Sequence, residues 1–385
     1  MSPHRSIAAV FATHGAVAGT LATRIPWLQD HLDLGPAALG LALLCPPIGA
    51  FVGMPLAGRL AHRLGGRTAT RLLLATWCAA ATLPVLAPSP VWLFPAFLLF
   101  GASSGMCDVV MNTHAVTLER HLGRSIMSGL HGMWSVGSLT AGGIGALAAH
   151  AGIDARIHLG AVSIALLVLG AAAGRGLLPD DSTADMPPPR RFALPTRAIL
   201  AVGVVGFCAT FTEGASSNWA AVYLTEVADA GPGLAAAGYT VFMFCMAGAR
   251  LMGDRVVRAF GPVVTVRAGG IVAAAGGAVV VAARTPVLVI AGFALVGLGV
   301  AVIVPLVFAA AGNAGANPSE GVAGVATITY LSGLSAPAVT GWLAGGLSYP
   351  AAFAVITGVV VLQALLAPAL RPSPARREGA PSGRP

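Results

Sequence analysis

The sequence contains about twelve apolar runs, each long enough to cross a lipid bilayer. These runs limit the folds that the chain can adopt more than any other feature. A helix needs roughly 20 apolar residues to cross a bilayer, and in its hydrocarbon core only helices or closed barrels satisfy their own backbone hydrogen bonds. The first six runs lie near residues 7–26, 37–57, 70–87, 91–115, 126–149 and 157–174. The second six lie near residues 197–222, 234–253, 262–283, 286–310, 321–346 and 350–370. The pattern predicts an all-α integral membrane protein with twelve transmembrane helices in two six-helix halves.

The composition excludes a soluble protein. Hydrophobic residues make up 56% of the 385 residues and charged residues 9%, and the mean hydropathy is +0.82. A soluble fold of this mixture would expose large apolar patches, which soluble monomers avoid.

The net charge of +8 does not indicate a nucleic-acid partner, because the arginines flank apolar runs instead of forming a basic patch. The five cysteines lie within apolar runs and contain no Cys-x-x-Cys pair, so neither disulfides nor a zinc site is predicted.

One polar segment divides the chain. Residues 179–195 hold several prolines and charged residues and are predicted to form a flexible cytoplasmic linker. The linker separates an N-terminal six-helix half, residues 1–178, from a C-terminal six-helix half, residues 196–372. The tail, residues 373–385, is rich in Pro, Gly and Arg and is predicted to be disordered and cytoplasmic.

The distribution of arginine predicts the orientation of the chain. All 22 basic residues are arginines, and cytoplasmic segments of membrane proteins carry an excess of basic residues. If the N-terminus is cytoplasmic, only Arg24, Arg156 and Arg284 lie on the opposite side. We therefore expect both termini on the cytoplasmic side of the cytoplasmic (inner) membrane, which requires an even number of spans.

Two related loop segments follow the second and the eighth span. They read Gly58-Arg59-Leu60-Ala61-His62-Arg63-Leu64-Gly65-Gly66-Arg67 and Arg250-Leu251-Met252-Gly253-Asp254-Arg255, the latter followed by Gly261. Both resemble the loop motif of the major facilitator superfamily, Gly-x-x-x-Asp-Arg-x-Gly-Arg-Arg, although His62 replaces the usual Asp in the first copy. Three further segments resemble the fucose-permease-like, YbjJ-like branch: Thr23-Arg24-Ile25-Pro26-Trp27, Asp108-Val109-Val110-Met111-Asn112, and Glu213-Gly214 with Asn218-Trp219.

This resemblance implies the major facilitator fold and a secondary transporter that works by alternating access. Its substrate, a small sugar-like or drug-like molecule, would bind between the halves near the middle of the membrane. The family analogy also suggests a monomer, and no cofactor is expected. The direction of transport, uptake or efflux, stays open. The sequence has no phosphate-binding Gly-x-x-x-x-Gly-Lys-Ser/Thr loop, so ATP-driven transport by this chain alone is not expected.

The two loop motifs are candidates for a conformational latch. Arginines at a cytoplasmic helix end can bond free carbonyl groups and complement the negative end of the helix dipole. Paired with a carboxylate, they would hold neighbouring helices in one conformation. The alternative is that the motifs only encode topology. The latch candidates are Gly58, Arg63, Gly65, Arg67, Arg250, Asp254 and Arg255.

Three ionisable residues are predicted to share one layer inside the membrane. His14 and Asp108 lie about 12 Å, and His131 about 9 Å, from the cytoplasmic ends of their helices, at 1.5 Å rise per residue. Ionisable groups within spans are costly and usually functional, so Asp108 is the candidate for proton coupling, with His14 and His131 as its neighbours. The alternatives are structural hydrogen bonds between helices or a metal site. We do not predict the metal site, because no supporting ligands accompany the three residues.

Other polar and aromatic residues within spans are candidates for contacting the substrate. Glu213 lies about 24 Å from the cytoplasmic end of the seventh span, where an alternative role is to pair with Arg24. Trp219 is either a platform for a sugar-like ring or an interfacial anchor. The candidates for substrate binding are Glu213, Asn112, Asn218, Trp219, Trp134, Tyr330 and Asn313.

These features together predict a proton-coupled carrier rather than an enzyme, with protons, a small-molecule substrate and the lipid bilayer as its partners. Two alternatives stay open. One is an intramembrane enzyme that uses the layer of His14, Asp108 and His131, and the other is a membrane sensor. The two loop motifs favour the carrier.

Overall fold

The computed structural model describes residues 1–34, 36–179, 197–314 and 318–371, whose regular structure is entirely helical. The tail predicted over 373–385 and nearly all of the linker predicted over 179–195 lie outside the described residues, so the domain boundaries stay predictions. The first half contains α1 (Pro3–Ala22), α2 (Ile25–His31), α3 (Pro36–Leu64), α4 (Gly66–Ala80), the 3-10 helix η1 (Pro84–Leu86), α5 (Pro90–Leu122), α6 (Met127–His150) and α7 (Ala155–Gly174). The second half contains α8 (Arg197–Ala228), α9 (Pro232–Ala282), α10 (Pro286–Val300), α11 (Ile303–Asn313), α12 (Pro318–Gly346), α13 (Tyr349–Leu365) and the 3-10 helix η3 (Ala367–Leu370).

The helices make the twelve crossings that the apolar runs predict. α1 with α2, α4 with η1, and α10 with α11 each form one interrupted crossing, whereas α9 contains two crossings joined at a kink. Within the described ranges, nine helical segments are long and apolar enough to span a membrane. α6 is not among them despite its 24 residues, because polar side chains line one of its faces. α13 has 17 residues and is slightly short.

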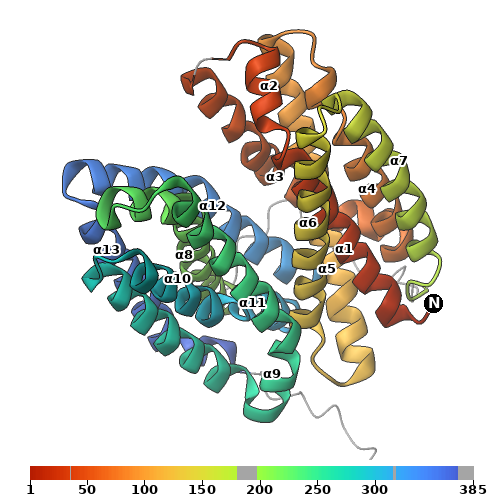
Figure 1. The fold of residues 1–385 in the computed structure, drawn as a ribbon. Coiled ribbons are helices and arrows are strands. Elements are labelled where there is room, and N and C mark those ends of the chain that lie inside the picture. The colour runs from red at the N-terminus through yellow and green to blue at the C-terminus, as the bar shows by residue number, and fades with distance from the viewer. Residues whose placement is uncertain (35, 180–196, 315–317, 372–385) are drawn as a thin grey trace, which may run out of the picture.

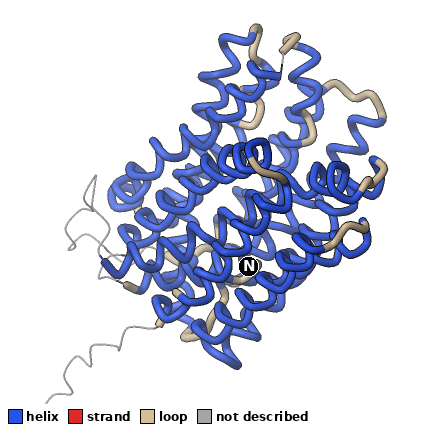
Figure 2. Tube along the Cα trace, turned by 90° about the vertical axis from the view of Figure 1, so that its left-hand side faces the viewer, coloured by secondary structure: helices blue, strands red, loops and turns tan. Residues whose placement is uncertain are grey.

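The two halves form separate bundles that meet at one end and diverge at the other (Figure 1). In the first half α1 packs against α6, α3 against α5, and α4 against α7. In the second half α8 packs against α12, and α9 packs against α10 and α13. The view turned by 90° shows that short loops join these long helices (Figure 2).

Two glycines with nearly the same backbone conformation mark the repeat of the halves. Gly65, between α3 and α4, has φ 81° and ψ 150°, and Gly261, at the kink of α9, has φ 76° and ψ 165°. Essentially only glycine adopts this region, so each glycine allows a sharp reversal between the second and third crossings of its half. The kink also corrects a predicted boundary. The eighth span continues to Gly261 instead of ending at 253, and Arg250 therefore lies well inside a helix.

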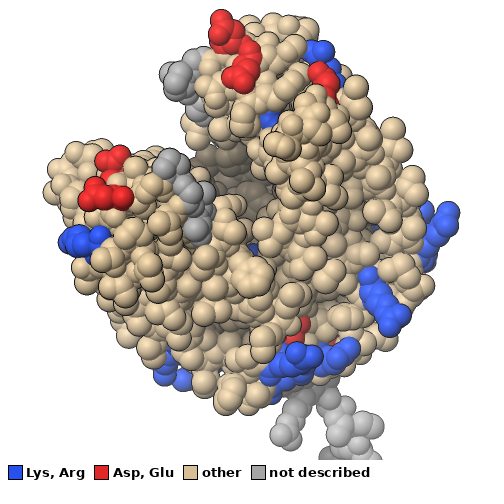
Figure 3. Space-filling view, viewed as in Figure 1, with Lys and Arg blue, Asp and Glu red and all other residues tan. Residues whose placement is uncertain are grey.

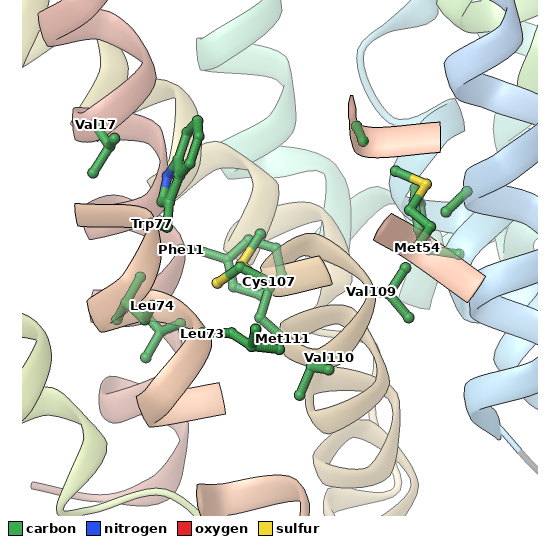
Figure 4. Packing of buried hydrophobic residues seen from close by; sticks show 14 of the residues in the cluster. Phe11, Val17, Met54, Leu73, Leu74, Trp77, Cys107, Val109, Val110 and Met111 are labelled. Carbon is green, nitrogen blue, oxygen red and sulfur yellow. The ribbon is translucent and has the colours of Figure 1, made fainter. Parts of the chain in front are cut away.

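Buried apolar side chains form two clusters. The larger one joins the core of the first half to α11 and the start of α12, for example through Phe308 and Val322. Its first-half part surrounds Trp77, Cys107 and Met111 (Figure 4). The smaller cluster lies within the second half. The two halves therefore share an apolar core that includes the region where α11 meets α5 and α6.

A hollow separates the halves at the opposite end (Figure 3). In this view most of the visible acidic side chains lie at the end where the hollow opens, and most basic side chains lie toward the closed end and along one flank. The distribution agrees with the arginine pattern from which the orientation is predicted. The closed end corresponds to the predicted cytoplasmic side.

Candidate transport site

A cavity of about 520 Å³ lies between the two halves and receives side chains from both. The three residues predicted to share a layer, His14 on α1, Asp108 on α5 and His131 on α6, all line it. Glu213 on α8 and Tyr330 on α12 line it from the second half. Helices that are distant in sequence thus place their ionisable groups around one space.

Asp108 and His131 are connected through Asn112. The Asn112 Nδ2 group donates to Asp108 Oδ1 at 3.0 Å and to the Asp108 carbonyl oxygen at 2.9 Å. Asn112 Oδ1 lies 3.2 Å from His131 Nε2, and because the amide oxygen is an acceptor, His131 Nε2 is the donor. Asn112 is fully buried. It therefore links two cavity residues and does not line the cavity itself, which differs from its predicted role in contacting substrate.

His14 contacts two tryptophans, and the hydrogen bond from Trp134 requires a neutral imidazole. The Trp134 indole donates from Nε1 to His14 Nδ1 at 3.0 Å. Because an indole N–H is only a donor, Nδ1 must be unprotonated, which leaves Nε2 to donate toward the Ser104 carbonyl oxygen at 3.5 Å. Trp77 stacks on the imidazole with ring centroids 5.2 Å apart and donates to the His14 carbonyl oxygen at 3.1 Å. Trp134 was predicted from the sequence, whereas Trp77 and Ser104 were not.

Glu213 forms a salt bridge with Arg250, at 2.9 Å between Oε2 and Nη2. The alternative pairing of Glu213 with Arg24 is therefore wrong, since Arg24 donates to His158 Nδ1 at 3.0 Å. Arg250 is 4% exposed, which is tolerable because all three of its donor groups are bonded. Besides Glu213, it donates to the Ala301 carbonyl oxygen at 3.1 Å and, across the halves, to Ser135 Oγ at 3.2 Å.

Arg250 is the site residue that the sequence prediction misplaced. The sequence groups it with the latch candidates, because the eighth apolar run ends near residue 253. The signal for its true position is the Gly261-Pro262 pair, which marks the end of the helix eleven residues later. That separation corresponds to about 16 Å along a helix, deep enough for the side chain to reach the cavity.

Three other substrate candidates lie away from the cavity. Asn218 is exposed and donates to the Gly214 carbonyl oxygen at 2.7 Å. Trp219 packs near Tyr349, with ring centroids 6.1 Å apart. Asn313 lies at the closed end, where its Oδ1 accepts a hydrogen bond from Arg120. The structure thus gives Asn218 and Trp219 local contacts and Asn313 a contact between the halves, instead of contacts with the cavity.

At the closed end, two carboxylates cap the N-terminus of α6. Glu119, from the same half, accepts from the backbone N–H groups of Ile126 at 2.8 Å and Met127 at 3.1 Å. Asp254, from the other half, accepts from those of Ser128 at 3.0 Å and Gly129 at 2.7 Å. These are the four N–H groups that a helix leaves unbonded at its start. One helix terminus is therefore satisfied partly within its own half and partly across the two halves.

Further contacts join the halves at the same end. Arg120 on α5 donates to the Gly312 carbonyl oxygen on α11, and Arg258 on α9 donates to the Ser125 carbonyl oxygen at 2.9 Å. Ser125 also donates to Asp254 Oδ1 at 3.2 Å. The remaining latch candidates make no comparable bridge that the structure shows: Gly58 is buried, Arg63 and Arg255 are exposed, and Arg67 donates to the Arg175 carbonyl oxygen within its own half.

Comparison of the sequence with models of protein families identifies the family of this chain. The family described as the Major Facilitator Superfamily matches residues 7–329. The chain belongs to the Major Facilitator Superfamily. An uncharacterised MFS-type transporter of Yersinia pestis is 34% identical over 334 residues, which cover 86% of this chain and 86% of the relative.

Two solved structures of FucP share the fold. FucP in the outward conformation superposes with a TM-score of 0.80 at 14% identity, over 96% of this chain and 99% of FucP. A variant of the E. coli fucose:proton symporter FucP gives a TM-score of 0.72 at 13% identity, over 96% and 99% of the two chains. Major facilitator proteins are multi-pass membrane transporters that bind small molecules and typically act as single chains. Within the described residues no group of three or more His, Cys, Asp or Glu side chains is arranged to hold a metal ion.

Proposed function

We propose that this protein is a proton-coupled secondary transporter that moves a small solute across the cytoplasmic membrane by alternating access. The observation that carries the proposal is a single cavity between the halves, lined by ionisable residues of both and closed at one end by contacts across the halves. With both termini cytoplasmic, as the arginine distribution predicts, the structure is the outward-open state.

Asp108 is the proposed proton-coupling residue. Its Oδ1 is held by Asn112, and no described group forms an ion pair with it, so its charge is not neutralised by a neighbour. Protonation would remove the cost of an unpaired charge at membrane depth. Because Asn112 also accepts from His131, a change in the charge of Asp108 acts directly on a hydrogen bond to α6. α6 is also the helix whose N-terminal N–H groups donate to Asp254 at the closed end.

Glu213 and Arg250 form the proposed substrate-side pair. Glu213 is 25% exposed in its side chain and faces the cavity, whereas Arg250 behind it is buried. Hydroxyl groups of Thr210, Ser217 and Ser332 line the same wall. Trp134 and Tyr330 add partly exposed aromatic surface. This mixture of hydroxyl groups and aromatic rings suits a small sugar-like or drug-like solute. The resemblance to a fucose:proton symporter supports the same class of mechanism.

Asp254 and its partners on α6 form the proposed latch. Alternating access requires the closed end to separate, and this separation breaks the bonds of Asp254 to Ser128 and Gly129 and of Arg250 to Ser135. Arg250 therefore couples the two events, because it touches Glu213 in the cavity and α6 across the interface. A substrate that binds Glu213 competes with Arg250 for the carboxylate and so disturbs the residue that also bonds Ser135 across the halves.

The alternative of an intramembrane enzyme is less well supported. His14 is engaged through both ring nitrogens, and His131 donates to an amide instead of contacting a nucleophile. A sensor needs no latch that spans the halves. Both alternatives would require a function outside the transport that characterises this superfamily.

Flux measurements in proteoliposomes test the proposal. Purified protein is given an imposed pH gradient and a panel of sugars and small drugs, and wild type is compared with Asp108→Asn and Glu213→Gln. We expect gradient-driven accumulation to be lost in Asp108→Asn while solute exchange persists. Glu226→Gln, which changes an exposed carboxylate on the same helix as Glu213, serves as the matched control. Normal accumulation by Asp108→Asn would show that Asp108 does not carry the coupling proton.

A further inference from the structure

An apolar groove on the outer flank of the first half lies far from the transport cavity. It has a volume of about 370 Å³ and runs between α4 and α7. These two helices lie on the side of the first half that faces away from the second half (Figure 1). The groove therefore opens onto the surface that meets lipid in a membrane, and its occupant does not depend on the proposed transport function.

The dimensions of the groove match one leaflet of a bilayer. Along α4 its lining extends from Thr68 to Cys78, a separation of ten residues that corresponds to a rise of about 15 Å. Half of the roughly 30 Å hydrocarbon core of a bilayer is also about 15 Å. Its lining combines the small residues Ala75, Gly170 and Ala171 with leucines from both helices. The groove thus has the length and the apolar character of a single acyl chain.

The end of the groove at the start of α4 is basic. Arg71 lines the groove, is exposed, and lies along Gly174 of α7. Arg67 donates to the Arg175 carbonyl oxygen, which ties the start of α4 to the end of α7 and brings residues 67, 71 and 175 close together. The described lining contains no acidic side chain. The positive charge at this end attracts an anionic headgroup.

We infer that this groove is a binding site for a phospholipid with an anionic headgroup, taken from the leaflet on the predicted cytoplasmic side. One acyl chain lies between α4 and α7, and the headgroup phosphates meet Arg71 with Arg67 and Arg175 nearby. Each arginine next to anionic lipid changes the affinity about fivefold, so the cluster selects an anionic headgroup over a zwitterionic one.

The second half supplies a matched control for Arg71. Arg267 follows Gly261 by six residues, just as Arg71 follows Gly65, and it is also exposed. It lies at the equivalent place in the repeat but outside the groove. A general attraction of lipid to arginine would affect both positions equally.

Native mass spectrometry of the purified full chain tests this site. The protein is titrated with phosphatidylglycerol or phosphatidylcholine of identical acyl chains. The variants are Arg71→Gln, Arg71→Lys, Ala171→Trp and Arg267→Gln. Arg71→Lys retains the charge and shows whether the position tolerates substitution, and Ala171→Trp fills the groove without changing charge.

We expect wild type to bind phosphatidylglycerol at least about fivefold more tightly than phosphatidylcholine. Arg71→Gln is expected to lower only the phosphatidylglycerol affinity, by about fivefold, with Arg71→Lys close to wild type. Ala171→Trp is expected to weaken both lipids, and Arg267→Gln neither. Equal affinity of wild type for the two lipids, or equal effects of Arg71→Gln and Arg267→Gln, would overturn the proposal.

Discussion

Replacing Asp254 by Asn is expected to open the closed end of the molecule. The carboxylate holds two backbone N–H groups of α6, at 3.0 Å and 2.7 Å, and these bonds join one half to the other. Asparagine keeps one acceptor oxygen, but it loses the negative charge, and its NH2 group faces a donor. One N–H of α6 is thereby left without its acceptor in the closed state. In the open state water solvates aspartate and asparagine at this position equally well. The substitution therefore raises mainly the free energy of the closed state.

The size of the effect follows from these contacts. A hydrogen bond to a charged group contributes about 1.5–3 kcal/mol, and a carboxylate at a helix N-terminus gains about 0.3–1 kcal/mol from the dipole. Losing one such bond and the charge costs the closed state about 2 kcal/mol, even if the remaining oxygen keeps its bond. At about 1.4 kcal/mol per factor of ten, the ratio of open to closed molecules rises about 30-fold.

Cysteine labelling measures this ratio. Val116 on α5 is fully buried and packs against Gly312 of the other half, so it becomes accessible only when the closed end separates. Val116→Cys, in a background without the five native cysteines, reacts with a maleimide at a rate proportional to the open fraction. We expect Asp254→Asn to raise that rate about 30-fold while the closed state dominates in wild type.

Glu119→Gln is the control for this experiment. Glu119 caps the same helix end with the same chemistry, but both partners belong to the first half. Loss of the Glu119 carboxylate destabilises the N-terminus of α6 equally in the open and closed states. The substitution also removes a negative charge close to Asp254. The labelling rate is therefore expected to stay equal or to fall. A rate in Asp254→Asn within twofold of wild type, or an equal increase in Glu119→Gln, would refute the latch.

Three further changes test the packing of the site and the repeat. Arg250→Ala leaves Glu213, which is 25% exposed, as an unpaired carboxylate in the cavity wall and is expected to cost about 1.5–3 kcal/mol. The loss is visible as a lower unfolding temperature in detergent, which Glu213→Gln in the same chain partly restores. Gly261→Ala forces a side chain into a backbone region that essentially only glycine adopts, with an expected loss of about 1–3 kcal/mol in the same assay. Gly101→Ala places a Cβ on the carbonyl oxygen of Pro46, so α3 and α5 must separate and folded yield is expected to fall. An unchanged unfolding temperature for either of the first two, or normal yield for the third, would contradict the contact concerned.

Several features of the fold were predictable from local sequence. The twelve crossings follow from hydropathy, because each stretch must satisfy its own backbone in lipid regardless of its neighbours. The two-half repeat follows from the loop motifs and is confirmed by the matching conformations of Gly65 and Gly261. The layer of His14, Asp108 and His131 follows from residue depth, since helical rise is constant. The structure places all three around one cavity.

The partners of the charged residues were decided by the tertiary structure alone. Arg250 and Asp254 lie one turn apart and both contact α6, yet only Arg250 also reaches Glu213 in the cavity. Helical side chains tilt toward the N-terminus, so the long Arg250 side chain extends toward the cavity, while the short Asp254 side chain stays near the closed end. Local pattern determined how many helices cross the membrane and how deep each residue lies. Which groups meet depends on how the helices are rotated and packed against each other, and that is settled only when both halves come together.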